Sequence, residues 1–148
     1  MNNNLKELKE SPAIQLHINI LQNIITRMAS NSANCKTWAI TIIAAILVLL
    51  FDKSQTEVSY LAYIPLTMFF SLDCFYLGME RHFREEYKAF LEGIEKSENL
   101  DFKNVYKIKG PKGICNKINL IVRGAWSFST TPLYITLALA IFIVLKVS

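Results

Sequence analysis

The residue with the clearest capacity for chemistry is Asp73, the single charged residue in an apolar run over residues 58–79. A carboxylate inside a membrane-spanning helix costs about 2.5–3.5 kcal/mol at the helix centre unless it meets water, a cation or a protein partner. Four hydroxyl-bearing residues precede it at helical spacing: Ser71, Thr67, Tyr63 and Tyr60. One interpretation is a water-filled path lined by all five residues, in which Asp73 favours cations. The alternative is structural: an ion pair with Arg123, or a protonated carboxyl bonded to a neighbouring helix.

A second candidate site is a basic stretch that contains no acidic residue. Its six members are Lys103, Lys107, Lys109, Lys112, Lys117 and Arg123. Such a stretch can hold a phosphate-bearing ligand through point charges. The simpler interpretation, which we favour, is a juxtamembrane segment that follows the positive-inside rule and touches anionic lipid. The central sequence KIKGPKG lacks the spacing of a Walker motif, so we expect no nucleotide-binding P-loop.

Other chemistry is poorly supported by the sequence. His17 and His82 are the only imidazoles and lie in different segments, without a neighbouring carboxylate constellation. Cys35, Cys74 and Cys115 form no C-x-x-C pair, which argues against a disulfide framework or a zinc site. No nucleophile motif such as G-x-S-x-G is present. We therefore expect no enzyme, no metal and no cofactor, and interpret the cysteines as small packing residues.

The elements that must position these residues are three apolar segments, expected as membrane spans over residues 36–51, 58–79 and 131–146. Hydrophobic residues make up 52% of the 148-residue chain and charged residues 19%, a balance that is ordinary for one membrane domain over residues 1–148. The first ten residues are polar, so we expect no cleavable signal peptide and a first span that remains as the insertion signal.

The distribution of Lys and Arg predicts the topology. Three precede the first span and Lys36 begins it, one lies between the first two spans, ten lie between residues 80 and 131, and Lys146 ends the third span. This asymmetry favours a cytoplasmic N terminus and an external C terminus in a multi-pass protein of the cell membrane. Tyr60, Tyr63 and Trp126 fit the aromatic enrichment of membrane interfaces.

The remaining segments are expected to be helical or basic loop. Ser11-Pro12 is a typical helix start, and residues 12–35 show the periodicity of an amphipathic helix. That helix either continues into the first span or bends at residues 31–34, and we favour its packing against another helix. Residues 80–96 predict a cytosolic helix with an apolar stripe for which the N-terminal helix is a suitable partner. A basic loop over residues 97–113 and an interfacial helix over 114–129 complete an all-α protein, expected to form a homo-oligomeric bundle.

The run LQNIITRMASNSANCKTWAITIIAAILVLL, followed by a short loop, a second span and MERHFREEYKAFLEGI, resembles a known group of proteins. These are small membrane proteins encoded beside nucleotidyltransferases in bacterial anti-phage systems: SLATT-like effectors and the membrane component of Hailong-type systems. The resemblance covers residues 12–96 and rests on the architecture and on the surroundings of Arg27-Met28-Ala29 and Lys36-Thr37-Trp38. The third span departs from a plain two-span SLATT layout.

The resemblance implies an oligomeric pore that depolarises the bacterial inner membrane during infection. It also implies a functional partner, the nucleotidyltransferase, whose nucleotide or single-stranded DNA oligomer product controls opening; in Hailong-type systems a DNA oligomer holds the channel shut. No ligand-binding residue carries over by motif, so the six basic residues are assigned from charge alone. The alternative hypothesis is a non-conducting membrane adaptor that recruits a cytosolic partner through residues 80–96.

Overall fold

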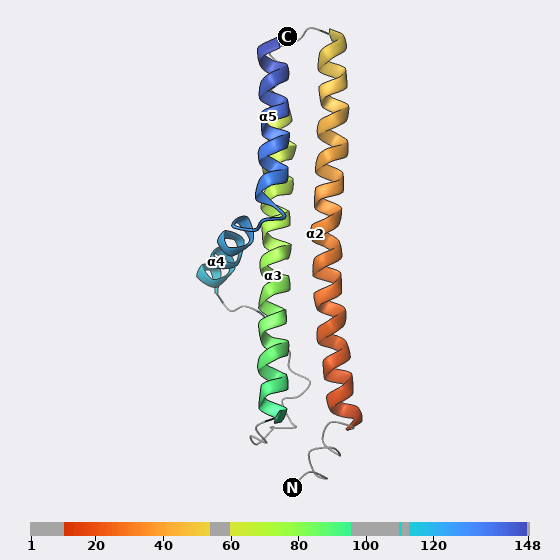
Figure 1. Ribbon diagram of the computed structural model, residues 1–148, viewed down its shortest axis with the longest axis vertical. Coiled ribbons are helices and arrows are strands. Elements are labelled where there is room, and N and C mark those ends of the chain that lie inside the picture. Colours follow the sequence, from red (N-terminus) through yellow and green to blue (C-terminus); the bar gives the residue numbers. More distant parts are fainter. Residues whose placement is uncertain (1–10, 54–59, 96–109, 111–112, 148) are drawn as a thin grey trace.

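The computed structural model describes residues 11–53, 60–95, 110 and 113–147, and these residues form an all-α protein. Four helices lie within them: α2 (Pro12–Lys53), α3 (Tyr63–Glu95), α4 (Ile114–Ala125) and α5 (Thr131–Val147). In Figure 1, α2 and α3 run side by side in opposite directions. α5 lies along the N-terminal half of α3, and α4 projects obliquely from α3. The all-α fold class predicted from the sequence is confirmed.

Helix α2 joins the predicted N-terminal helix and the predicted first span into one helix of 42 residues. Pro12 occupies its first position, where a missing backbone N–H leaves no hydrogen bond unmade. No Gly or Pro follows before Lys53. The helix continues through residues 31–34 without interruption, so the alternative of a bend there is wrong.

Helix α3 likewise joins the predicted second span and the predicted cytosolic helix. A short 3₁₀ turn at residues 60–62 precedes it. Pro65 is the third residue of α3, within the first turn, where backbone N–H groups have no partner inside the helix. Proline is accommodated at such a position without kinking the helix.

Two apolar clusters hold the bundle together, one toward each end. Three helices meet in the first, whose buried members are Ala39, Ile43, Ala62, Leu66, Tyr134 and Ile141. Two helices meet in the second, in which Leu21 and Ile25 of α2 pack against Phe83 of α3. The predicted pairing of the N-terminal helix with the cytosolic helix is therefore confirmed, and it occurs within a single chain.

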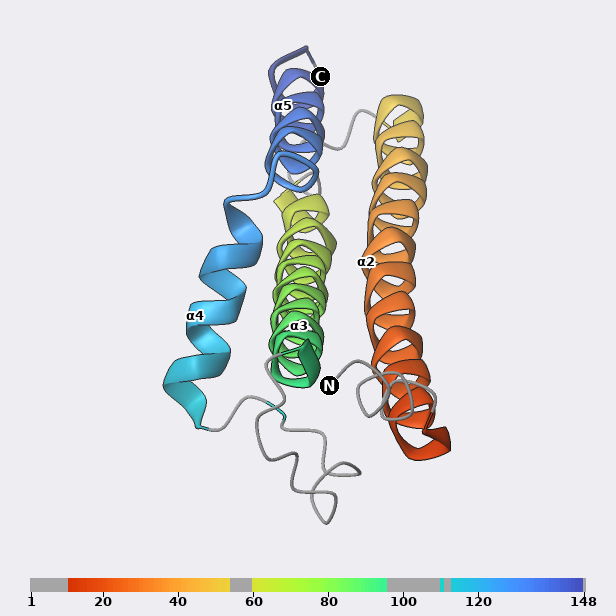
Figure 2. The ribbon, with the colours of Figure 1, turned by 60° about the horizontal axis from the view of Figure 1, so that its bottom comes forward.

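Length and composition make α2 and α3 suitable for crossing a membrane, and residues 131–146 of α5 form a shorter apolar helix. Large apolar side chains are exposed on all three helices, for example Val48, Ile64 and Phe142. Figure 2 shows the same three helices grouped at one end, with α4 inclined away from them. Exposed apolar surfaces of this kind are typical of sites that contact other proteins or lipid.

Candidate functional site

A buried ion pair joins the two long helices between their apolar clusters. Lys36 Nζ of α2 lies 2.7 Å from Asp73 Oδ1 of α3, with the Lys36 side chain 16% exposed and that of Asp73 0% exposed. Ser32 completes the arrangement: its Oγ donates to Asp73 Oδ1 at 2.5 Å and accepts from Lys36 Nζ at 3.0 Å. The carboxylate thus receives one charge-assisted and one hydroxyl hydrogen bond on the same oxygen.

Helical spacing explains how α2 supplies both partners. Ser32 and Lys36 are four residues apart, so their side chains lie one above the other on the same face. This face also carries Leu21, Ile25 and Ala39, which are buried against neighbouring helices. Ser32 therefore occupies a position in the apolar seam, while the longer Lys36 side chain reaches Asp73 from its edge.

Buried polar groups also occur on α3 and around the start of α5. Asp73 Oδ2, Thr130 Oγ1 and Tyr134 Oη are buried and make no hydrogen bond to any residue in the described part of the chain. Cys35 and Cys74 are each adjacent in the chain to one member of the ion pair. The two thiols are free and buried, as expected for packing residues. The carboxylate is thus only half satisfied, which makes its loss of hydration costly.

Asp73 does not belong to the predicted polar stripe. Ser71, Thr67 and Tyr60 are exposed, whereas Asp73 is buried against α2. The reason is geometric: Ser71 and Asp73 are two residues apart and hence about 200° apart around a helix. Asp73 therefore lies on a different face of α3 from Ser71, and the prediction that all five residues line one path stays a prediction.

The hydroxyls of the stripe also have partners within their own helix. Ser71 Oγ donates to the Thr67 carbonyl oxygen at 2.8 Å, and Thr67 Oγ1 donates to the Tyr63 carbonyl oxygen at 2.9 Å. Such back-bonding satisfies a hydroxyl donor without water. The stripe by itself is consequently weak evidence for an aqueous path.

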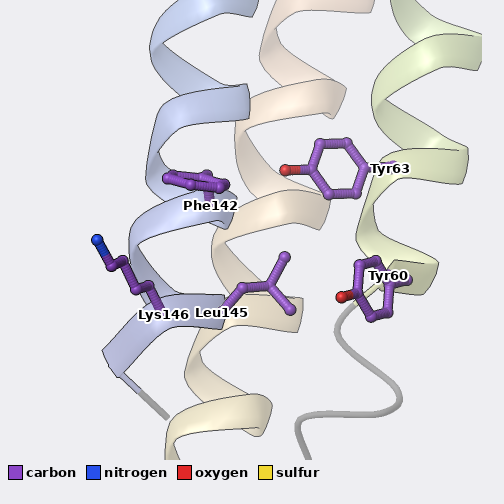
Figure 3. Close-up of a pocket in the computed structure, with 5 residues that line it drawn as sticks. All are labelled: Tyr60, Tyr63, Phe142, Leu145 and Lys146. Atoms are coloured by element: carbon purple, nitrogen blue, oxygen red, sulfur yellow. The ribbon is translucent and has the colours of Figure 1, made fainter.

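Two stripe residues line a groove between the start of α3 and the end of α5. The groove has a volume of about 360 Å³ and is lined by Tyr60, Tyr63, Phe142, Leu145 and Lys146. Figure 3 shows the two tyrosine rings on one side, with their hydroxyls directed toward the α5 side chains. An apolar groove of about 230 Å³, also between α3 and α5, reaches Tyr134 and Thr131.

Arg123 pairs with Glu85, so the proposed structural pair between Asp73 and Arg123 is wrong. Arg123 Nη2 lies 2.7 Å from Glu85 Oε1, and both side chains are half-exposed. The hydrogen bond from Arg123, aided by its positive charge, lowers the pKa of the Glu85 carboxyl below its ordinary value. Arg81 adds a second contact, because its Nη1 donates to the Arg123 carbonyl oxygen at 2.5 Å near the end of α4.

Two glycines allow the backbones of α3 and α4 to approach each other. A Cβ on Gly78 of α3 would overlap the carbonyl oxygen of Leu120, and a Cβ on Gly124 of α4 would overlap that of Cys74. Sequence reasoning missed this contact, although small residues within apolar helices are a known signal of close helix packing. The glycines and the two arginines together fix α4 on α3.

The predicted phosphate-binding set falls largely outside the described residues. Lys103, Lys107, Lys109 and Lys112 lie there, and Lys117 belongs to α4 but its side chain is not among those described. Arg123 is described and is paired with Glu85. The ligand prediction therefore stays a prediction.

Neither histidine joins a candidate metal centre in the described ranges. The ring of His17 lies 4.4 Å from that of Phe90, and the ring of His82 lies 5.5 Å from that of Phe83. No group of three His, Cys, Asp or Glu side chains suited to a metal ion is found within residues 11–53, 60–95 and 113–147.

Comparison with protein-family models, with curated proteins and with solved structures finds no match for this chain.

Proposed function

We propose that the protein is a membrane effector that assembles into a homo-oligomer and conducts ions, with the Lys36–Asp73 pair controlling access to the conducting path. The observation that carries the proposal is this ion pair, buried between two helices that are apolar enough to cross a membrane. Ionisable residues in such helices are costly and usually mark ion or proton pathways. A buried ion pair is also seldom the most stabilising choice for its position, which favours a functional reason for it.

The ion pair is suited to act as a gate, because Lys36 keeps cations from reaching the Asp73 carboxylate while the pair is formed. While Lys36 holds the carboxylate, no net charge is offered to a passing cation. Separation of α2 from α3 would replace the ammonium by water or by a cation and would leave Asp73 as the selective group. The partial exposure of Lys36 lets its ammonium remain hydrated after separation.

An oligomer is needed because three helices are too few to enclose a water-filled path. The path that we propose runs along the α2–α3 face that carries Asp73, and the exposed hydroxyls of Tyr60, Thr67 and Ser71 on the other side of α3 are available for contacts between copies. The orientation that we propose has the N terminus in the bacterial cytoplasm. Control by a nucleotide or DNA oligomer from a partner nucleotidyltransferase is proposed from the sequence resemblance and the basic stretch.

Recording from purified protein in planar bilayers tests conduction. We expect discrete cation-preferring currents that change when a single-stranded DNA oligomer is added on the side of the basic stretch. Glu92→Gln provides a matched control, because it removes a carboxylate from an exposed position on the same helix. Absence of current with and without the oligomer would contradict the proposal.

The adaptor hypothesis has less support. It requires the apolar stripe of residues 80–96 to be available to a cytosolic partner. Phe83 and Ile94 of that stripe are buried, and Phe83 packs against α2 of the same chain. The side chains left exposed there include the charged Arg84 and Lys88.

A further inference from the structure

Helix α4 has two opposite apolar faces, and one of them has no partner within the described chain. Leu120 and Gly124 are buried against α3. Ile118 and Val122 are 54% and 51% exposed. Each exposed residue lies two positions from a buried one and hence on the other side of the helix. α4 therefore packs on α3 with one face and presents apolar side chains with the other.

The corner that follows α4 continues this exposed apolar surface. Trp126 is 87% exposed and Phe128 is 95% exposed. The corner has a defined geometry: Thr130 N donates to the Ser127 carbonyl oxygen at 3.1 Å, and Thr131 Oγ1 donates to the Ala125 carbonyl oxygen at 2.5 Å. Two large aromatic side chains are thus displayed by an ordered turn.

The position of the corner fits the boundary of a membrane. α5 begins at Thr131 directly after it, and its 17 residues extend about 25 Å at about 1.5 Å per residue. Because the hydrocarbon core of a bilayer is about 30 Å thick, α5 reaches across most of it only if it begins at the boundary. Aromatic residues, Trp above all, concentrate at this boundary, and amphipathic helices with Trp and Phe lie along it.

Charge identifies which surface fits best. Besides Arg123, which is paired with Glu85, five basic residues and no acidic one occur from Lys103 onward in the segment that leads into and includes most of α4. An acidic lipid surface attracts such a segment electrostatically. A second copy of the same basic segment would be repelled.

We infer that Ile118, Val122, Trp126 and Phe128 form a membrane seat, a surface that inserts at the headgroup–acyl boundary of a leaflet containing acidic phospholipid. The inference rests on the membrane location in the proposed function but not on conduction. Because α4 is fixed to α3 through Gly78, Gly124 and Arg81, the seat sets the depth of α3 in the bilayer.

The two tryptophans of the chain make the seat directly measurable. Trp38→Phe leaves Trp126 as the single fluorophore, and Trp126→Phe leaves Trp38 as the control. Each variant is placed in vesicles of phosphatidylcholine and phosphatidylglycerol containing lipids brominated at different depths. We expect blue-shifted Trp126 emission, quenched best by the shallowest bromines. Brominated phosphatidylglycerol should quench it more than the same fraction of brominated phosphatidylcholine, with the difference shrinking in about 0.5 M salt.

Other outcomes distinguish insertion of the membrane seat from the membrane location of the protein as a whole. Quenching of Trp38 without quenching of Trp126 overturns the seat and leaves the membrane location intact. Quenching of neither residue overturns both. Blue-shifted Trp126 emission that resists quenching at every protein-to-lipid ratio means that a protein surface, such as a second copy, covers the corner, and this too overturns the seat. Equal quenching by the two brominated lipids removes the preference for acidic phospholipid.

Discussion

Lys36 and Asp73 place opposite charges 2.7 Å apart although 37 residues separate them in the chain. The contact ties α2 to α3 at a level between the two apolar clusters. The stability of the bundle and the charge presented to any ion therefore depend on the same pair of residues.

Removal of either charge should destabilise the bundle, but unequally. Lys36→Met leaves a fully buried carboxylate without its cation and should cost about 3–5 kcal/mol in free energy of unfolding. Asp73→Asn should cost less, because the partly exposed Lys36 ammonium can move toward water. The double variant Lys36→Met with Asp73→Leu should unfold close to the parent, or at higher denaturant. Equilibrium unfolding in detergent, followed by circular dichroism, measures all three.

The same series decides between two partners for Asp73. Adding Arg123→Gln to Asp73→Asn should restore nothing, because Arg123 is held by Glu85. Recovery of stability in that double variant would show that Asp73 and Arg123 interact after all.

Close packing of α4 predicts a strong effect of small substitutions at two glycines. Gly124→Val should release α4 from α3, because its side chain would collide with the backbone of Cys74. Gly93→Ala is the matched control: a Cβ there meets no atom within 4 Å, and alanine should stabilise α3 by about 0.5–1 kcal/mol. Protease cleavage near residue 125 should accelerate in the first variant alone. Equal cleavage rates in Gly124→Val and Gly93→Ala would show that the glycine contact does not hold α4 on α3.

Acid should weaken the contact between Glu85 and Arg123. The pKa of Glu85 is lowered in the folded protein, so its contribution is present above the unfolded value of about 4.3 and is lost as pH falls through the lower folded value. The loss of stability on acidification should be modest and should be smaller at high salt, because both side chains are half-exposed. Cross-linking between α3 and α4 should decline below about pH 4.3. Glu85→Gln should lower the cross-linking yield at neutral pH and should abolish its decline in acid.

The membrane orientation predicts opposite results for two reporter fusions. A reporter active in the periplasm should be active after Ser148 and inactive near Asn99, because basic residues are concentrated in the segment that precedes the last helix. Reversed activities would mean that the lysines and arginines do not set the topology, or that residues 131–146 do not cross the membrane.

The sequence was sufficient for the helical class and for the pairing of α2 with α3. Pro12 marked a helix start, and the apolar periodicity around Leu21 and Phe83 indicated which faces meet. These features are local, so the 3.6-residue repeat reveals them. Uninterrupted α2 was harder to anticipate, because helix propensities at Asn31 and Ser32 are weak and packing against α3 overrides them.

The partner of Asp73 could not be read from periodicity, because contacts between helices depend on their register. A signal was nevertheless present: Ser32 occupies a seam position of α2, and Lys36 follows it by one turn. The separation of Asp73 from Ser71 also follows from helical geometry alone, about 100° per residue. Arg123 was assigned to a ligand from charge alone, and its partner Glu85 lies on another helix.

We propose that Asp73 selects ions once Lys36 releases it, and the reversal potential of bilayer currents measures that selection. A reversal potential does not depend on how many channels assemble, so lower stability of a variant does not distort it. Under a KCl gradient the parent and Glu92→Gln should show the same cation preference. Lys36→Met should raise this preference, and Asp73→Asn should shift the reversal potential toward zero. Identical reversal potentials in all four proteins, or no current in any of them, would contradict the account.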